Sequence, residues 1–297
     1  MDWTIGKLLA WAGPYLSRHA VTAPRLSAEL LLARALDLTR LQLYLNYDRP
    51  LGLLELAAFK ALLLRRRAHE PVAYLLGCRE FYGLELAVGP GALIPRPETE
   101  HLVETGLKLL RESSSPQVLD LCTGSGAVAL ALAAACPQAQ VWASDISPEA
   151  LHYAALNAKN LQLSQRVHLR QGDLWQPWAA DSRRFDLITA NPPYVSQQQW
   201  RELSPEIKDF EPSLALLGGN DGLDLIKNII EGAHAFLRPA ASLLIELGAG
   251  QARAAGRLAA EAGIFQKIYT VSDLAGHERV LVCVSNNKRS WHGQTGN

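Results

Sequence analysis

The chain has 297 residues, of which 48% are hydrophobic and 20% charged, as in globular proteins with one large or two ordinary domains. Its 29 basic residues balance its 29 acidic residues, so the overall charge does not favour nucleic-acid binding across the whole surface. The four cysteines form no CxxC pair and have no histidine at metal-ligand spacing. We therefore expect reduced thiols rather than disulfides, and no metal site.

Hydropathy along the chain bears on where the protein acts. The N-terminus lacks the charged-then-apolar pattern of a secretory signal, and no uncharged apolar run reaches the length of a membrane span. We therefore expect a cytoplasmic protein without a membrane partner. Nothing in the sequence points beyond a monomer.

Residues 1–75 are predicted to form a helical domain. Segments 27–36 and 51–67 are rich in alanine and leucine at helical spacing, and Pro14 predicts a kink or a break in the first helix. Pro71 is expected to end the last helix. The domain carries no catalytic constellation of its own, so we expect a role in recognition of the substrate or in packing.

Residues 76–115 are predicted to form a hairpin and a linker helix. The pattern up to Val88 is short and alternating, with Gly77 and Gly83 at turn positions, as in a β-hairpin. A turn bracketed by prolines, residues 93–100, then opens a helix.

Residues 116–285 alternate predicted strands with alanine- and leucine-rich helices. Such alternation predicts an α/β fold, with a Rossmann-like, mostly parallel sheet of seven strands and helices on both faces. The polar residues 286–297 predict a flexible tail. The strands are expected at residues 118–121, 140–144, 166–170, 185–190, 242–247, 267–271 and 279–284.

The turn after the first of these strands, Asp120-Leu121-Cys122-Thr123-Gly124-Ser125-Gly126, is suited to bind a nucleotide. Gly124 and Gly126 permit a tight turn and let a ligand approach the backbone closely. Asp145, followed by Ile146, ends the next strand, where a carboxylate can accept hydrogen bonds from ribose hydroxyl groups.

Polar residues also end the third and fourth strands, namely Asp173, followed by Leu174, and Asn191. The carboxyl ends of parallel strands meet at one edge of an open α/β sheet. These residues should therefore converge with Asp120 and Asp145. The sequence predicts a ligand pocket at this edge.

The fourth strand runs into Asn191-Pro192-Pro193-Tyr194 (NPPY), whose two prolines lack an N–H group and stiffen the loop. Their backbone carbonyl groups therefore have few competing donors nearby. Asn191 adds a side-chain acceptor, and Tyr194 adds a flat aromatic face. Such a loop suits a planar group that carries an NH2, although Asn and Pro are also common in ordinary turns.

Two nucleotide ligands fit the glycine turn. Gly124-x-Gly126-x-x-Ala129 satisfies the dinucleotide pattern, so NAD is one candidate. Asp120 lies just before the glycines, however, and suits a cationic ligand better than a pyrophosphate. The chain also offers one mononucleotide-type half rather than two. S-adenosylmethionine carries a sulfonium and an ammonium group, so the acidic residues favour it.

With these residues the chain resembles the class I S-adenosylmethionine-dependent methyltransferases, and within them the release factor glutamine methyltransferases of the HemK type. The resemblance covers nearly the whole chain and is far more specific than NPPY alone. It departs at Cys122, where glycine is usual, and at Leu174, where an aromatic residue is common. The matching stretches are residues 93–100, 120–126, 145, 191–194, 219–223 and 245–248.

The resemblance implies methyl transfer from S-adenosylmethionine to the side-chain amide nitrogen of the glutamine in the Gly-Gly-Gln motif of class I peptide chain release factors. Asn191 and Pro192 would accept hydrogen bonds from the amide NH2, and Tyr194 would pack on the amide plane, so these are the expected catalytic residues. The expected substrate-binding residues are Asn191, Pro192, Pro193 and Tyr194. The expected cofactor-binding residues are Asp120, Cys122, Thr123, Gly124, Ser125, Gly126, Asp145, Ile146, Asp173, Leu174 and Asn191.

Other functions share parts of this pattern. NPPY would serve the exocyclic amines of DNA or RNA bases equally well, but such enzymes usually carry a basic face or an added recognition domain. Glutamine methylation of a ribosomal protein is a second alternative. A binding module that has lost catalysis would have no need of NPPY, and an NAD oxidoreductase would need a proton-transfer partner that is not evident.

Overall fold

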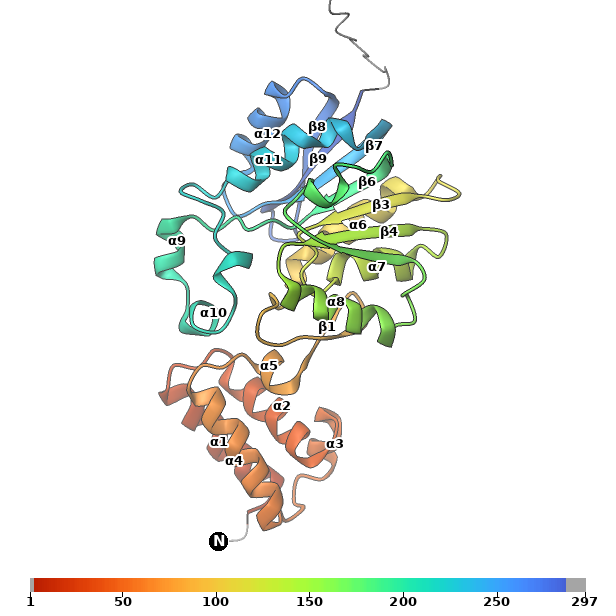
Figure 1. The fold of residues 1–297 in the computed structure, drawn as a ribbon. Coiled ribbons are helices and arrows are strands. Elements are labelled where there is room, and N and C mark those ends of the chain that lie inside the picture. Colours follow the sequence, from red (N-terminus) through yellow and green to blue (C-terminus); the bar gives the residue numbers. More distant parts are fainter. Residues whose placement is uncertain (1–2, 287–297) are drawn as a thin grey trace, which may run out of the picture. The chain divides into compact units, whose positions relative to one another are not determined.

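The computed structural model describes residues 3–286, so the predicted tail lies outside the described residues from residue 287 onwards. The chain folds into two compact units, whose elements are labelled in Figure 1. The first unit contains the chain up to residue 79 together with residues 88–90 and 204–211, and the second contains residues 80–87, 91–203 and 212 onwards.

The first unit is a bundle of helices around a core of buried apolar side chains, such as Leu8, Leu31 and Phe59. Helix α1 continues through Pro14, so it is not broken there. Helix α4 ends at Arg67, before Pro71, as predicted, but the sequence did not predict the short helix α5, which begins directly after Pro71, at a position where the missing N–H costs nothing. The helices of this unit are α1 (Ile5–Arg18), α2 (Pro24–Leu36), α3 (Arg40–Leu45), α4 (Leu53–Arg67), α5 (Val72–Leu76) and α10 (Pro205–Lys208).

A two-stranded hairpin follows these helices in the sequence, as predicted, and consists of β1 (Cys78–Phe81) and β2 (Leu84–Ala87). Tyr82 and Gly83 form its two-residue turn, with φ angles of 50° and 74°. Two consecutive positive φ angles match the right-handed twist of hairpin strands, and Gly83 adopts such an angle without steric cost.

The second unit contains a sheet of seven strands in the order β5-β4-β3-β6-β7-β9-β8. All neighbours are parallel except for β9, which runs antiparallel to both β7 and β8. The predicted α/β fold with a mostly parallel sheet is confirmed. The strands are β3 (Gln117–Leu121), β4 (Gln140–Asp145), β5 (Val167–Gln171), β6 (Phe185–Ala190), β7 (Leu237–Glu246), β8 (Phe265–Ser272) and β9 (Glu278–Ser285).

Helices cover both faces of this sheet. None of the helices within residues 3–286 is long and apolar enough to cross a lipid bilayer. The helices of the second unit are η1 (Pro97–Thr99), α6 (Glu100–Leu110), α7 (Ala127–Ala135), α8 (Pro148–Asn160), η2 (Gln176–Trp178), α9 (Gln197–Glu202), η3 (Ser213–Ala215), α11 (Asp224–Gly232), η4 (Ala233–Ala235) and α12 (Ala252–Glu261).

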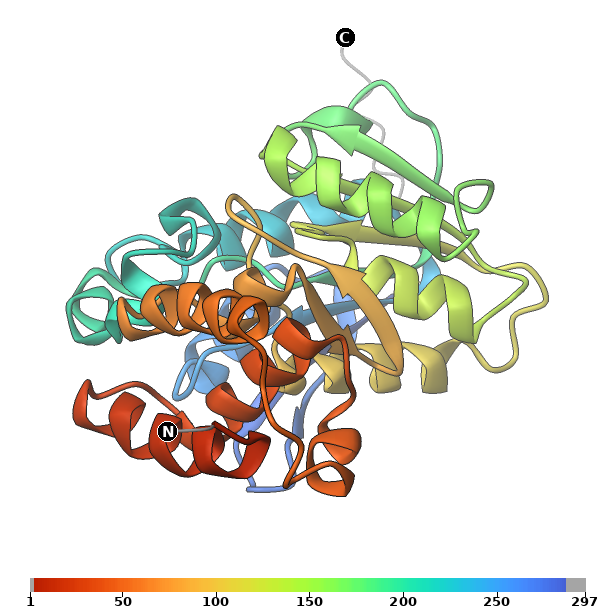
Figure 2. The ribbon, with the colours of Figure 1, turned by 90° about the horizontal axis from the view of Figure 1, so that it is seen from below.

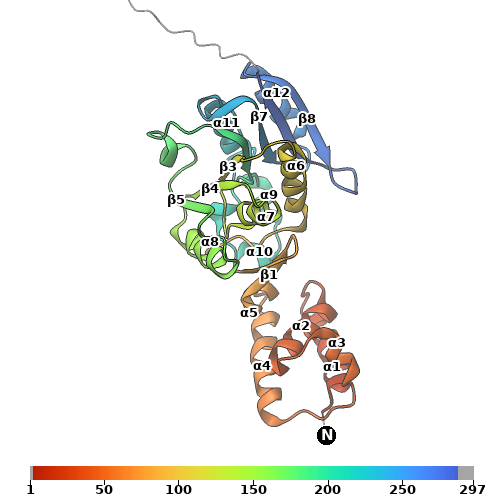
Figure 3. The same cartoon turned by 90° about the vertical axis from the view of Figure 1, so that its right-hand side faces the viewer.

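Alternation along each strand creates two cores, one on each face. Val118 of β3 packs in the cluster that includes α6 and α7, whereas its neighbour Leu119 packs in the cluster that includes α11 and α12. Figure 2 shows α6, α7 and α8, coloured from yellow to green, side by side, and Figure 3 shows α6 and α11 on opposite sides of β3. Strands buried on both faces are apolar throughout, so a polar residue at a strand end stands out.

Candidate active site

A cavity of ≈ 330 Å³ lies at the carboxyl ends of β3, β4, β5 and β6. β3 pairs with β4 on one side and with β6 on the other, so the strand order reverses there. Open α/β sheets bind ligands at such a point, and the volume falls in the range of small-molecule sites. The predicted site residues that line this cavity are Asp120, Cys122, Thr123, Gly124, Ser125, Asp145, Ile146, Asp173, Leu174, Asn191 and Pro193.

Three predicted residues of the described chain do not line the cavity, namely Gly126, Pro192 and Tyr194. Gly126 has a φ angle of 85°, and a Cβ atom there would lie 3.3 Å from the Cβ atom of Ala154 in α8. Close packing against α8 and the positive φ angle therefore account for a glycine at this position. Ligand contacts for Gly126, Pro192 and Tyr194 remain predictions.

The carboxylate of Asp120 organises the turn after β3. It is buried, and its two oxygens accept hydrogen bonds from the hydroxyl groups of Thr123 (2.6 Å) and Thr189 (2.7 Å). Burial raises the pKa of Asp120 to about 6, against these hydrogen bonds, which favour the charged form. Asp120 thus joins the turn to the neighbouring strand β6.

Asp145 at the end of β4 holds two backbone segments of the cavity wall. Its Oδ2 atom accepts a hydrogen bond from the Gly124 N–H (2.8 Å), and its Oδ1 atom accepts one from the Ser147 N–H (2.9 Å). Burial raises the pKa of Asp145, while these backbone hydrogen bonds act in the opposite direction. The predicted ribose-binding carboxylate therefore also shapes the glycine turn.

Cys122 lies among the acidic residues of the cavity and has a φ angle of 55°. This left-handed conformation explains why glycine suits the position. Burial, followed by the charges of Asp145, Asp120 and Asp173, raises the pKa of the Cys122 thiol well above its usual range. The thiol therefore stays protonated, and the same three carboxylates make the cavity favourable for a cation.

The turn after β5 brings Leu174, rather than Trp175, to the cavity. The Trp175 ring stacks on Phe236 with centroids 4.9 Å apart and an interplanar angle of 2°, and its indole N–H donates to the Asn228 carbonyl (3.0 Å). Trp175 thus faces the sheet core. The apolar surface that this turn offers a ligand comes from Leu174.

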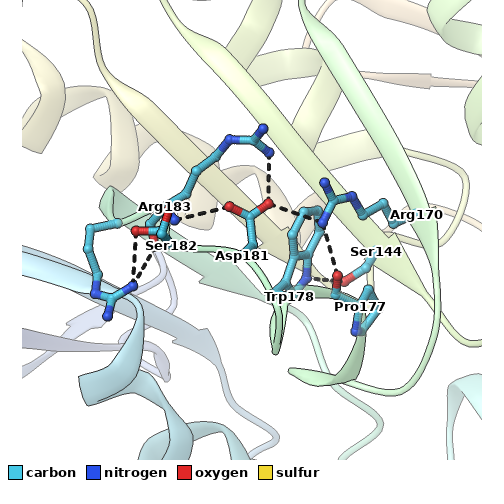
Figure 4. A network of polar contacts seen from close by, with 8 residues as sticks. Ser144, Arg170, Pro177, Trp178, Asp181, Ser182 and Arg183 are labelled. Carbon is cyan, nitrogen blue, oxygen red and sulfur yellow. Dashed lines mark hydrogen bonds and ion pairs between the residues drawn. The ribbon is translucent and has the colours of Figure 1, made fainter.

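The chain beyond this turn is secured by the polar network shown in Figure 4. Asp181 forms ion pairs with Arg170 (3.1 Å) and Arg183 (3.0 Å). The indole N–H of Trp178 donates to the hydroxyl of Ser144 (3.2 Å), and the Arg170 guanidinium lies 4.6 Å above the Trp178 ring. These contacts join the segment after β5 to β4 and thereby fix the wall that carries Asp173 and Leu174.

The NPPY loop lies against the turn that precedes α6. The Nδ2 atom of Asn191 donates a hydrogen bond to Thr99 Oγ1 (3.1 Å). The Tyr194 carbonyl accepts one from Gln251 Nε2 (3.0 Å), and the Val195 N–H donates to the Leu216 carbonyl (2.8 Å). The loop is therefore held from several sides, as a rigid binding site requires.

The Tyr194 side chain is partly buried and packs against the core that contains α11 and α12. Its hydroxyl group donates to Oε1 of Glu246 at the end of β7 (3.3 Å). Burial raises the pKa of Glu246 to about 7 and raises that of Tyr194 as well. Both groups are thus neutral or only partly charged near pH 7.

Several residues that line the cavity had no role predicted from the sequence. Pro95, Arg96 and Thr99 are among them, and their only signal was the match of residues 93–100 to the resembled family. Leu214 and Ala215, from the segment between β6 and β7, also line the cavity, and no local pattern distinguished them.

Comparison with known proteins identifies the family. Residues 7–77 match the model of the PrmC N-terminal domain, and residues 118–210 match that of a methyltransferase domain. The release factor glutamine methyltransferase of Rhodopirellula baltica is 41% identical over 283 residues, which cover 94% of this chain and 95% of that protein. This chain belongs to the release factor glutamine methyltransferases.

A second member of this family of glutamine methyltransferases, from Geobacter sulfurreducens, is 42% identical over 279 residues, which cover 94% of this chain and 96% of the relative. Among solved structures, the hMettl16 catalytic domain is similar in fold, with a TM-score of 0.58 and 17% identity over 74% of this chain and 82% of that one. The family membership confirms the predicted enzyme class.

Proposed function

We propose that the protein methylates the side-chain amide nitrogen of the glutamine in the Gly-Gly-Gln motif of class I peptide chain release factors, with S-adenosylmethionine as methyl donor. The observation that carries this proposal is that Asn191 of NPPY lines the same cavity as three acidic residues. One cavity thus offers an acceptor for an amide NH2 beside groups that suit a cationic nucleotide. Membership in the family supports a release factor, rather than a nucleic acid or a ribosomal protein, as the substrate.

The residues of the cavity fit S-adenosylmethionine. Ser125 lines the cavity, and its buried Oγ atom has no hydrogen-bond partner in the described part of the chain, so a polar group of a ligand could satisfy it. The two oxygens of Asp145 accept hydrogen bonds from the Gly124 and Ser147 N–H groups, and a carboxylate has about four acceptor sites, so one would serve a ribose hydroxyl. Ile146 and Leu174 would offer apolar surface to the adenine. When bound, S-adenosylmethionine supplies the electrophilic methyl group of its sulfonium.

Orientation of the glutamine amide is the main task of the chain's own residues. An amide nitrogen is a poor nucleophile because its lone pair is delocalised into the carbonyl group. Since the Nδ2 atom of Asn191 is engaged by Thr99, its Oδ1 atom remains to accept one hydrogen of the substrate NH2. The Pro192 carbonyl would accept the other hydrogen, and the Tyr194 ring would pack on the amide plane. Orientation of this kind can supply about 7–11 kcal/mol of the barrier reduction.

Methyl transfer from labelled S-adenosylmethionine tests the proposal. The substrates to compare are a class I release factor, the same factor with its Gly-Gly-Gln glutamine changed to alanine, ribosomal proteins, and single-stranded and duplex DNA. We expect label on the unchanged factor alone. Label on DNA or on a ribosomal protein, with none on the factor, would mean that the pocket is assigned correctly and the substrate wrongly.

A further inference from the structure

Gln251 lies in the turn between β7 and α12 and contacts the NPPY loop through its side-chain amide. We infer that Gln251 is a positioning residue, which holds the Tyr194 end of NPPY in the conformation that methyl transfer requires. This inference rests on the proposed function, because it deepens the role given there to the loop. The sequence predicted no role for Gln251.

Both ends of the Gln251 amide form hydrogen bonds within the second unit. Its Nε2 atom donates to the carbonyl groups of Tyr194 (3.0 Å) and Gly222 (3.2 Å), and a third carbonyl, of Asp221, lies farther away (3.5 Å). Its Oε1 atom accepts a hydrogen bond from the Gly248 N–H (2.9 Å). An amide offers two protons and one acceptor oxygen, so these partners fix its orientation. One side chain therefore joins NPPY, the segment before α11 and the turn after β7.

The neighbours of this amide leave no room for a further side chain. A Cβ atom at Gly222 would lie 2.1 Å from the Tyr194 carbonyl oxygen and 2.6 Å from the Nε2 atom of Gln251. A Cβ atom at Gly248 would lie 3.1 Å from Gln251 Oε1. A side chain at Gly222 would therefore separate Gln251 from the loop, because a backbone oxygen cannot move aside as the end of a flexible side chain can.

The Tyr194 end of the loop matters because the rest of NPPY has little freedom. Its two prolines have fixed φ angles. In the peptide group that joins Tyr194 to Val195, the carbonyl accepts from Gln251 and the N–H donates to the Leu216 carbonyl (2.8 Å). Both polar atoms of this peptide group are thus bonded. Loss of Gln251 would free one of them and let the group rotate.

These contacts also decide which backbone carbonyl of the loop is left for the substrate. The Tyr194 carbonyl is engaged by Gln251. Gly218 lies against the Pro193 carbonyl, since a Cβ atom at Gly218 would be 2.4 Å from that oxygen. The Pro192 carbonyl remains, and it is the acceptor that the proposed function assigns to the second hydrogen of the glutamine amide. A rotation of the loop would move this acceptor and weaken the orientation of the amide.

Steady-state methylation of a class I release factor by the full chain tests the inference. Gln251→Met keeps nearly the same length and removes both polar ends, and we expect it to lower kcat by about tenfold or more. The KM for the factor and the Kd for S-adenosylmethionine should stay within about twofold of wild type, since Gln251 does not line the cavity. Calorimetric titration counts the S-adenosylmethionine sites, so that kcat refers to folded protein alone.

Gln140→Met is the matched control. Gln140 is also half-buried, and its Oε1 atom lies 3.1 Å from Nε2 of His168, but it lies at the start of β4, away from the strand ends that form the cavity. The control should leave kcat within about twofold of wild type, since it loses the same side-chain amide outside the loop. A wild-type kcat in Gln251→Met, or equal losses in the two variants, would overturn the inference.

A measurement without turnover separates this inference from the proposed function. Tyr194-Val195 is the only Tyr-Val pair in the sequence, so labelling with carbonyl-¹³C tyrosine and ¹⁵N-valine gives a single carbonyl–amide correlation signal. The Tyr194 carbonyl resonance should shift in Gln251→Met, because this carbonyl loses a hydrogen-bond donor, and stay in place in Gln140→Met. An unmoved resonance in Gln251→Met would contradict the positioning role. A shift combined with a wild type that does not methylate the factor would contradict only the proposed substrate.

Discussion

The buried guanidinium group of Arg66 in α4 lies 2.7 Å from the carboxylate of Glu206 in α10, although 140 positions separate the two residues in the sequence. Arg66 also donates to the backbone carbonyls of Thr22 (3.2 Å) and Glu70 (2.9 Å). The segment that carries α10 follows NPPY in the chain, yet it belongs to the helical unit. The chain between β6 and β7 is therefore anchored outside the sheet that it connects.

We expect Glu206→Ala to release α10 from this anchor. The change leaves the buried Arg66 without its charged partner, at a cost of about 1.5–3 kcal/mol for a hydrogen bond to a charged group. Amide hydrogen exchange in α10 should therefore become faster by about tenfold or more, while exchange in β3 stays unchanged. Glu202→Ala in α9, an exposed glutamate, is the control. Unchanged exchange in α10 would show that the ion pair does not anchor it.

Replacement of Asn191 by alanine should abolish turnover while S-adenosylmethionine affinity stays nearly unchanged. The variant removes the acceptor for the substrate NH2, and loss of one preorganised group of this kind lowers kcat by about 10²–10³-fold. Single-turnover methylation and calorimetric titration of S-adenosylmethionine provide the two measurements. A large loss of cofactor affinity would contradict the role given to Asn191.

Asp145→Ala should have the reverse effect and raise the Kd for S-adenosylmethionine. The variant removes the proposed ribose acceptor and also releases the Gly124 and Ser147 N–H groups that Asp145 holds. Loss of a charged hydrogen-bond partner predicts a Kd at least about tenfold higher. Circular dichroism checks that the variant is folded. Cofactor binding as tight as in the wild type would exclude the ribose assignment.

The free energy of unfolding should depend on pH through the buried carboxyl group of Glu246, whose pKa is raised from 4.5 to about 7. Because the pKa of Glu246 is higher in the folded state than in the unfolded chain, the folded state binds more protons between the two values. The contribution of Glu246 to the free energy of unfolding is complete below about pH 4.5 and is lost as the pH rises through about 7. The pKa of Asp120 is also raised, so this residue too lowers stability as the pH rises, but at lower pH. Its effect is the same in the wild type and in Glu246→Gln. The free energies of unfolding of the wild type and of Glu246→Gln, measured with denaturant at several pH values, therefore differ only by the contribution of Glu246.

Cys122→Gly should leave the fold as stable as the wild type or stabilise it by up to about 1.5 kcal/mol. A left-handed φ costs a residue with a side chain about 1–2 kcal/mol, and glycine avoids this cost but loses about 0.5–1 kcal/mol through its more flexible unfolded chain. Cys122→Val should destabilise, since a β-branched residue tolerates such an angle poorly. Thermal unfolding measures both variants, and a Val variant as stable as the Gly variant would argue against backbone strain at Cys122.

The sheet and the edge where the cavity lies could be predicted from local patterns. The alternation of Val118 and Leu119 between two cores, and the glycines of the turn after β3, reflect preferences that act over a few residues. The extra helix α5 after Pro71 was missed, because one proline can end a helix or begin the next.

The amino-acid sequence by itself determined the α/β fold, the NPPY loop and the acidic residues that line the cavity, because each depends on spacing along the chain. Only the tertiary structure decided that Thr99 binds Asn191 across 92 positions, and that Glu206 joins Arg66. Which residues pair in this way depends on how distant segments of the chain pack together. Threonine and glutamate are also common at the surface, so the residue types alone do not indicate a buried partner. A buried hydrogen-bond partner is therefore visible only once the chain is folded.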